Sequence, residues 1–208
     1  MIAELIGALI ASIYGIGTAF RNKMPLFYKI ILFSMLTCFM GNIYTLLYEF
    51  LWQQGDRSFH VGHLGYIGMF FFLFSSYYGA FDSLADGKQP ELRRFRLFAG
   101  LVAVLYFAVS VFLMALSGKE LWRYLVLLPM SFTLYFAAKH LIIPDVDMGI
   151  IKVMRPYNAL IIALCIFMML GLFSAPGSKF ELICRIGTGF LMAACLPIAR
   201  NGVRKWFI

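Results

Sequence analysis

The chain has 208 residues, of which 62% are hydrophobic and only 13% are charged, and its mean hydropathy is +0.84. Water-soluble domains have about 45–50% apolar and about 25% charged residues, so this composition excludes an ordinary soluble domain and a disordered chain. Lysine and arginine outnumber aspartate and glutamate by 18 to 10, a net charge of +8. Membrane proteins gather such an excess in their cytoplasmic loops, so we expect a lipid bilayer, and no nucleic acid, as the partner.

Seven segments are apolar for about 20 residues, the length of helix that crosses the hydrocarbon core of a bilayer. Only helices and closed barrels satisfy a backbone in lipid, and these runs lack the strict alternation of barrel strands. The sequence therefore predicts one all-α domain over residues 1–208, a polytopic transmembrane bundle of seven helices. Its spans are expected at about 2–20, 26–52, 64–84, 97–117, 121–143, 157–173 and 180–199.

The basic residues predict the orientation of this bundle. With the N-terminus outside, 13 lysines and arginines fall on the cytoplasmic side and 5 on the outer side, while the acids divide evenly. This bias predicts an N-terminus outside and a C-terminus in the cytoplasm, in an integral, multi-pass protein of the plasma (inner) membrane.

An odd number of spans permits a parallel 3+1+3 repeat, because spans 1–3 and 5–7 then share one orientation. A weak similarity between the two halves of the chain fits this pattern. The alternative is coincidence, because the spans use few residue types. Gly41 follows Pro25 by 16 residues, Gly171 follows Pro156 by 15, and an Ile-Gly pair occurs at both 67–68 and 186–187.

The first two spans carry small and polar stripes. Gly7, Ala11 and Gly15 recur every four residues, a spacing that predicts a tight helix-packing seam. In span 2, Asn42, Thr45 and Glu49 fall on one helical face. An unpaired amide in hydrocarbon costs several kcal/mol, so Asn42 should bond to another helix or line a cavity.

Span 3 continues the polar pattern with Ser75, Ser76 and Asp82. Asp82 is close to the basic cluster that begins at Lys88. It is either a solvated acid at the interface or a carboxylate that handles protons or cations.

Span 5 contains Pro129, followed by Ser131 and Tyr135. A proline inside a helix removes one hydrogen bond, and a kink beside hydroxyl groups serves either packing or a binding site. In span 7, Glu181 and Arg185 are four residues apart and can pair on one face. This pair is either a ligand or gating site or a structural anchor near the outer headgroups.

Motifs of known chemistry are absent from the sequence, which has no HExxH, GxSxG, P-loop, Rossmann or CxxC pattern. His60 and His63 lie on the outer side and His140 on the inner side, so no pair can hold a haem within the membrane. We expect no cofactor, no metal and no catalytic residue, and an enzyme is the less favoured class.

One resemblance concerns spans 2 and 3. The residues Gly41-Asn42 and Leu47, followed by Phe59-x-x-Gly62 and Tyr66, faintly resemble the pattern of the lysoplasmalogenase family of membrane proteins. That family has an aspartate where this chain has Asn42, and no second Ser-Asp motif follows in the later spans. The resemblance implies a membrane hydrolase, and we do not assign the chain to the family.

Three functional hypotheses follow. The first is a membrane protein that binds and translocates a small or amphiphilic, lipid-like molecule through a polar interior between spans 2, 3, 5 and 7. The second is a seven-helix sensor or membrane subunit whose basic cytoplasmic face docks a protein partner or anionic lipid. The third is a membrane-embedded lipid hydrolase. The candidate ligand-binding residues are Asn42, Thr45, Glu49, Ser75, Ser76, Asp82, Ser131, Tyr135, Glu181 and Arg185.

Overall fold

The computed structural model describes residues 2–20, 24–52, 61–81, 90–117, 121–144, 149–175 and 177–207. All regular structure in these ranges is helical, as predicted. The first half contains α1 (Ile2–Ala19), α2 (Leu26–Trp52) and α3 (Val61–Ser76), which continues into the π-helical turn η1 (Tyr77–Phe81). The 3-10 turn η2 (Pro90–Leu92) leads into α5 (Arg93–Ser117), which is followed by α6 (Leu121–Ile142), α7 (Ile150–Phe173) and α8 (Lys179–Phe207).

Six of these seven α-helices are long and apolar enough to cross a membrane, so the chain is an integral, multi-pass membrane protein. The shorter helix is α3, with 16 residues before the π-helical turn. Large apolar side chains cover the outside of the bundle. Phe190, for example, lies within α8 and has 73% of its surface exposed, as suits a side chain that faces lipid.

Several helices extend beyond the predicted spans, because hydropathy follows the hydrocarbon core and a helix can continue into the headgroup layer. α7 begins at Ile150 instead of 157, after Gly149 with its positive φ of 65°, and it runs through Pro156. α5 begins at Arg93 instead of 97, and α8 passes through Pro197 to end at Phe207 instead of 199.

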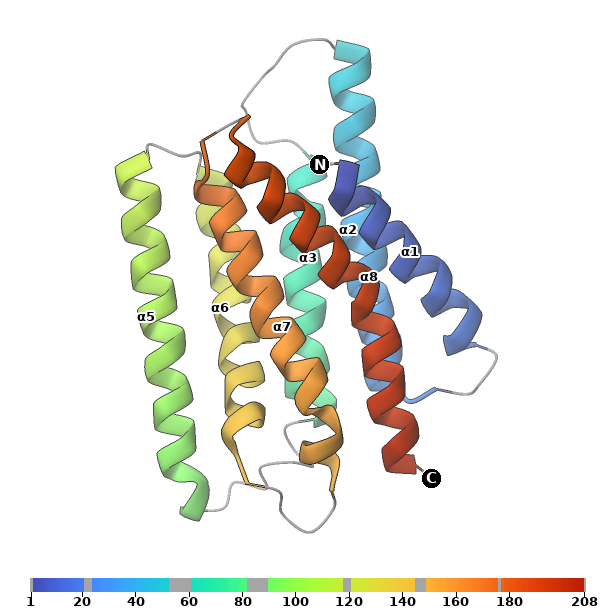
Figure 1. The fold of residues 1–208 in the computed structure, drawn as a ribbon, viewed down its shortest axis with the longest axis vertical. Coiled ribbons are helices and arrows are strands. Elements are labelled where there is room, and N and C mark those ends of the chain that lie inside the picture. The colour runs from blue at the N-terminus through green and yellow to red at the C-terminus, as the bar shows by residue number, and fades with distance from the viewer. Residues whose placement is uncertain are drawn as a thin grey trace.

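Six helices form a closed ring in the order α1, α2, α3, α6, α7 and α8, with α8 packed against α1. α5 lies outside this ring and packs on α6 and, more lightly, on α7 (Figure 1). The interior is filled by buried side chains, among them Met35, Met69, Leu127, Cys165 and Leu196.

Glycines set the closest helix contacts. A Cβ on Gly41 would lie 2.6 Å from the Cα of Gly65, so α2 and α3 approach backbone to backbone. A Cβ on Gly7 would meet the carbonyl of Gly189, which brings α1 equally close to α8. The seam predicted in the first span is confirmed, because Gly7, Ala8, Ala11, Ser12 and Gly15 are buried.

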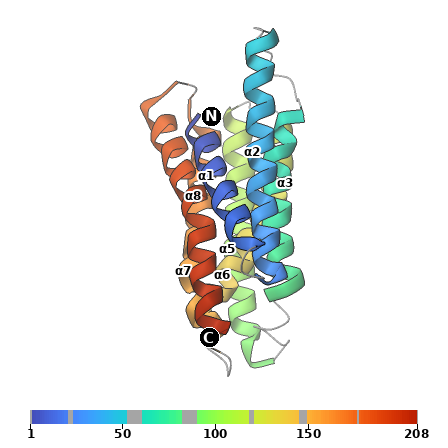
Figure 2. The same ribbon diagram turned by 90° about the vertical axis from the view of Figure 1, so that its right-hand side faces the viewer.

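The last turns of α2 rise above the ends of the other helices (Figures 1 and 2). Consequently Asn42, which is central in α2 by sequence, bonds to Tyr66, only five residues from the start of α3. Asn42 therefore lies nearer the end of the bundle where α1 and α8 begin than its position in the span suggests.

Candidate functional site

A polar network connects four helices near the end of the bundle where α1, α3 and α8 begin. We call it the Arg185 network, and its members are Glu4, Asn42, Tyr66, Glu181 and Arg185. The Nη1 atom of Arg185 lies 2.9 Å from Oε2 of Glu4, and its Nε and Nη2 atoms each lie 2.8 Å from Oε1 of Glu181. The guanidinium therefore joins two carboxylates, one on its own helix and one on α1.

Tyr66 extends the network to α2. Its hydroxyl oxygen lies 2.8 Å from Oδ1 of Asn42 and 3.2 Å from Oε2 of Glu4. One hydroxyl proton cannot serve both acceptors fully, and the shorter distance favours Asn42. The amide of Asn42 in turn donates to the carbonyl of Cys38, 2.9 Å away. Of the two alternatives for Asn42, hydrogen bonding between helices is therefore what the structure contains.

Local sequence at the start of α8 fixes the position of Glu181. The Oγ of Ser178 accepts a hydrogen bond from the backbone N–H of Glu181, and Oε2 of Glu181 accepts one from the N–H of Gly177. This Ser-x-x-Glu arrangement satisfies N–H groups that a helix start leaves without partners. Arg185 follows one turn later, so its pairing with Glu181 is set by helix geometry.

The network combines deep burial with an accessible cation. Glu4 is only 6% exposed and Asn42 only 1%, whereas the side chain of Arg185 is 36% exposed. The bonds to the two carboxylates use three of the five N–H groups of the guanidinium. The remaining two can hold an anionic oxygen pair, and the two carboxylates lie beside them.

The structure thus brings together three predicted residues, Asn42, Glu181 and Arg185. Glu4 and Tyr66 complete the site and were missed, because nothing local in the sequence links Glu4 to Arg185 on the last helix. The rule that an ionisable residue inside a span has a partner was the available signal.

The other predicted residues do not join this site. Thr45 is half-buried and donates to the carbonyl of Gly41, while Glu49 is exposed on the protruding end of α2. Ser75 is exposed on α3, so the expectation that it faces a shared interior is wrong, as it is for Glu49. Asp82 lies outside the described residues. The structure places each of the other two serines against its own helix: Ser76 donates to Leu73 and Ser131 to Leu127.

A second polar cluster lies toward the opposite end of the bundle. We call it the Tyr77 cluster, and its members are Tyr77, His140, Tyr157 and Asn158, each at most 1% exposed. The hydroxyl of Tyr77 donates to Oδ1 of Asn158 at 2.8 Å, and the Tyr77 ring stacks on His140 with centroids 5.7 Å apart. Among the described residues, the hydroxyl of Tyr157 and the Nδ2 of Asn158 have no hydrogen-bond partner. Buried groups of this kind are commonly satisfied by an internal water.

Tyr77 belongs to the π-helical turn η1, a feature that often occurs at functional sites. Next to the cluster, Lys139 is only 2% exposed, and its Nζ lies 5.0 Å from the ring centroid of Phe136. The ring shields this buried ammonium through a cation–π contact.

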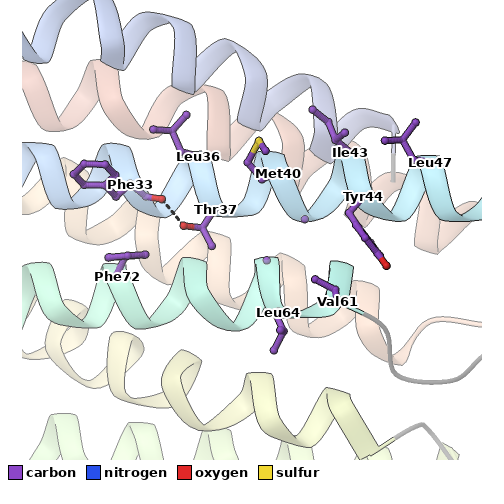
Figure 3. A pocket seen from close by; sticks show the side chains of 12 residues that line it. Phe33, Leu36, Thr37, Met40, Ile43, Tyr44, Leu47, Val61, Leu64 and Phe72 are labelled. Atoms are coloured by element: carbon purple, nitrogen blue, oxygen red, sulfur yellow. Dashed lines mark hydrogen bonds between the residues drawn. The ribbon is translucent and has the colours of Figure 1, made fainter.

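Apolar grooves open on the sides of the bundle, and described residues line the two considered next. The α2/α3 groove has a volume of about 620 Å³ and lies between Phe33, Met40 and Tyr44 of α2 and Leu64 and Phe72 of α3 (Figure 3). The hydroxyl of Thr37 faces the carbonyl of Phe33, so it offers little to a ligand. The α5 groove, of about 500 Å³, lies between α3, α5 and α6 and includes the predicted residues Ser131 and Tyr135.

No family model, curated protein or solved structure matches the chain. Within the described ranges, no group of three histidine, cysteine, aspartate or glutamate side chains is arranged to hold a metal ion. The site must therefore be interpreted from its own geometry.

Proposed function

We propose that the protein is a seven-helix transporter for a small molecule, with its N-terminus outside and its C-terminus in the cytoplasm. α3 and η1 together contribute 16 and 5 residues, about 31 Å of helix at about 1.5 Å per residue. This length matches a hydrocarbon core of about 30 Å, so the segment serves as the seventh crossing. The basic residues, 13 of them on the side of the C-terminus, support the orientation.

Cysteine labelling tests this topology, because all four native cysteines are buried. The Lys179→Cys variant should react with a membrane-impermeant thiol reagent on intact cells. The Arg204→Cys variant should react only after permeabilisation, and the reverse pattern would refute the orientation.

We further propose that α1–α3 and α6–α8 are two parallel repeats, with α5 as the connecting helix. Exchanging α1 with α6, α2 with α7 and α3 with α8 maps each neighbouring pair of the ring onto another neighbouring pair. The α1·α8 contact, for example, corresponds to the α6·α3 contact. The peripheral place of α5 agrees with a helix that belongs to neither repeat (Figure 1).

The packing register within each repeat supports the same relation. The second and third helices of each repeat touch at two pairs of residues. The two contacting residues are four positions apart on the second helix, and their partners are three positions apart on the third helix. The second and third helices therefore pack with the same spacing in both repeats. The contacts are Gly41 with Gly65 and Thr37 with Gly68 in the first repeat, and Gly171 with Cys184 and Phe167 with Gly187 in the second.

The observation that carries the transport proposal is the ion pair between Glu4 and Arg185. It joins α1 of the first repeat to α8 of the second, at the end proposed to face outside. At the other end, the bond between Tyr77 and Asn158 joins η1, the continuation of α3, to α7, again across the two repeats. Rocking of one repeat against the other would open one contact while the other stays closed, as in transporters built from repeats.

The ligand chemistry follows from the charges of the Arg185 network. The two remaining N–H groups of Arg185 suit a carboxylate or phosphate, and the carboxylates of Glu4 and Glu181 beside them suit an ammonium group. A small zwitterion supplies both. The side of the network toward the bundle interior is apolar, with Cys38 and Met69 buried, which favours a ligand with an apolar portion.

Uptake of radiolabelled leucine into proteoliposomes tests this function, with choline and acetate as cation-only and anion-only comparators. We expect saturable uptake of leucine that falls at least about tenfold in Arg185→Gln, since a hydrogen bond to a charged group contributes about 1.5–3 kcal/mol. Lys179→Gln removes the same charge from an exposed position of α8 and should leave uptake unchanged. Equal uptake by the two variants, or no saturable uptake by the native chain, would contradict the proposal.

A sensor or membrane subunit is the second candidate, and the continuity of α8 favours it. This helix runs for 29 residues from the Arg185 network to the exposed Arg204 and Lys205. It contacts α1 near both ends, because Arg200 also donates to the hydroxyl of Tyr14 at 3.0 Å. A ligand that displaces Glu4 from Arg185 would shift α8 and the basic end that docks an acidic partner. Saturable leucine binding without flux would select this candidate.

A further inference from the structure

The α5 groove is an aromatic cleft beside the peripheral helix. Phe74 and Tyr78 form one wall, Phe132 and Tyr135 form another, and Gly100 and Phe107 of α5 close the third side. Ser131 reaches the groove, but its hydroxyl is bonded to the carbonyl of Leu127. The volume of about 500 Å³ falls within the range of about 300–1,000 Å³ that encloses a ligand, and the lining favours an apolar one.

A cation lies on the same face of α5 as this groove. The lining residues Gly100 and Phe107 are seven apart, and Arg93 precedes Gly100 by another seven. Seven residues are about two helical turns, so the three positions form one stripe along the helix. Arg93 is exposed, about 10 Å along the axis from Gly100. Arg94 is also exposed, but it points about 100° away around the helix.

This arrangement matches the two parts of a phospholipid. We propose that the α5 groove holds one acyl chain of an anionic phospholipid whose phosphate lies against Arg93. The stripe places the cation at the end of α5, where a spanning helix meets the headgroups, and the aromatic cleft about two to four turns deeper, where acyl chains lie. A free phosphate would contact only Arg93, and a neutral lipid would occupy only the α5 groove.

The lipid would have a structural role at this position. α5 packs on α6 and α7 and lies outside the ring, while α3 forms the far wall of the groove. An acyl chain there bridges α5 to α3, which makes the bound lipid part of the contact between the peripheral helix and the first repeat. The proposal needs only the membrane location of these helices, and it involves neither the Arg185 network nor transport.

Native mass spectrometry of the purified full chain tests the site. After reconstitution with equal phosphatidylglycerol and phosphatidylcholine, we expect one retained lipid that is preferentially phosphatidylglycerol. Arg93→Gln should lower that preference about fivefold, the factor that one cation at an anionic surface supplies. Arg94→Gln is the matched control and should keep the preference. Equal behaviour of the two variants, or equal retention of the two lipids by the native chain, would overturn the assignment of the headgroup.

A second measurement tests the groove itself. Gly100→Leu projects a side chain into the groove and should reduce retention of the lipid, whereas Gly17→Leu adds the same group where the structure has open space. In the native chain, phosphatidylglycerol with a photoreactive group on its tail should label peptides that contain Phe107 or Phe132. This readout does not depend on whether the glycine variant folds. Labelling confined to α2, or lipid retention that is equal in both glycine variants, would overturn the proposal.

Discussion

Replacing Arg185 by glutamine removes the guanidinium that holds Glu4 and Glu181 together. The two carboxylates differ in how well water can solvate them once the guanidinium is gone. Glu181 lies at the start of α8 and is partly exposed, so water can replace its partner. Glu4 is 6% exposed, so its charge would stay in a poorly solvated position beside the hydroxyl of Tyr66. The cost of the substitution is therefore concentrated on Glu4.

The magnitude can be bounded from general values. Breaking a buried ion pair by removing one partner costs about 3–5 kcal/mol. The side chain of Arg185 is 36% exposed, so the loss should lie at the lower end of this range. We expect Arg185→Gln to lose about 3 kcal/mol, a fall in Tm of roughly 6–12 °C.

Thermal unfolding in detergent measures this loss, with a thiol-reactive dye reporting exposure of the four buried cysteines. Lys179→Gln is the matched control and should change Tm little. The double variant Glu4→Gln/Arg185→Gln should regain much of the stability, because the carboxylate is gone. A Tm loss in Arg185→Gln that Glu4→Gln does not relieve would refute the reasoning.

Two further substitutions test the packing and the second cluster in the same unfolding assay. Gly41→Ala should cost about 1–3 kcal/mol, because its Cβ meets the backbone of α3, whereas Gly17→Ala in open space should change stability by no more than about 0.5 kcal/mol; equal effects would contradict the close approach of α2 and α3. Tyr77→Phe should cost about 1–3 kcal/mol by leaving the Asn158 oxygen without its donor. Tyr157→Phe is the control, because its hydroxyl has no hydrogen-bond partner among the described residues. If it lowers stability as much as Tyr77→Phe does, the hydrogen bond to Asn158 does not explain the loss.

Sequence patterns predicted what local geometry and hydropathy determine. The helical class, the small-residue seam of α1 and the pairing of Glu181 with Arg185 depend on spacing within one helix, and the structure has all three. The side chain of Asn42 was expected either to form a hydrogen bond to another helix or to line a cavity. It bonds to Tyr66, as expected from the free-energy cost of an unpaired amide in lipid.

The rest depended on which helices become neighbours. Glu4 and Tyr66 join the site because Gly7 lets α1 approach α8 and Gly41 lets α2 approach α3. Neither contact is encoded by residues close in sequence. Ser75 was predicted to line the interior, but it is exposed. A serine in a span need not face inward, because its hydroxyl can bond to a carbonyl of its own helix. The start of α7 was missed because the apolar span was predicted to begin only at 157, whereas the helix begins at Ile150 and continues through Pro156.

The protruding end of α2 has a consequence for the surrounding bilayer. At 27 residues the helix is about 40 Å long, against about 30 Å of hydrocarbon, and its upper turns expose Leu47, Phe50 and Leu51. Apolar side chains this far from the bilayer midplane either thicken the bilayer locally or make the helix tilt. Each response costs a fraction of a kcal/mol per ångström of hydrophobic mismatch. The mismatch lies on the flank that α2 occupies, so acyl-chain length becomes a variable to which the stability of the protein responds.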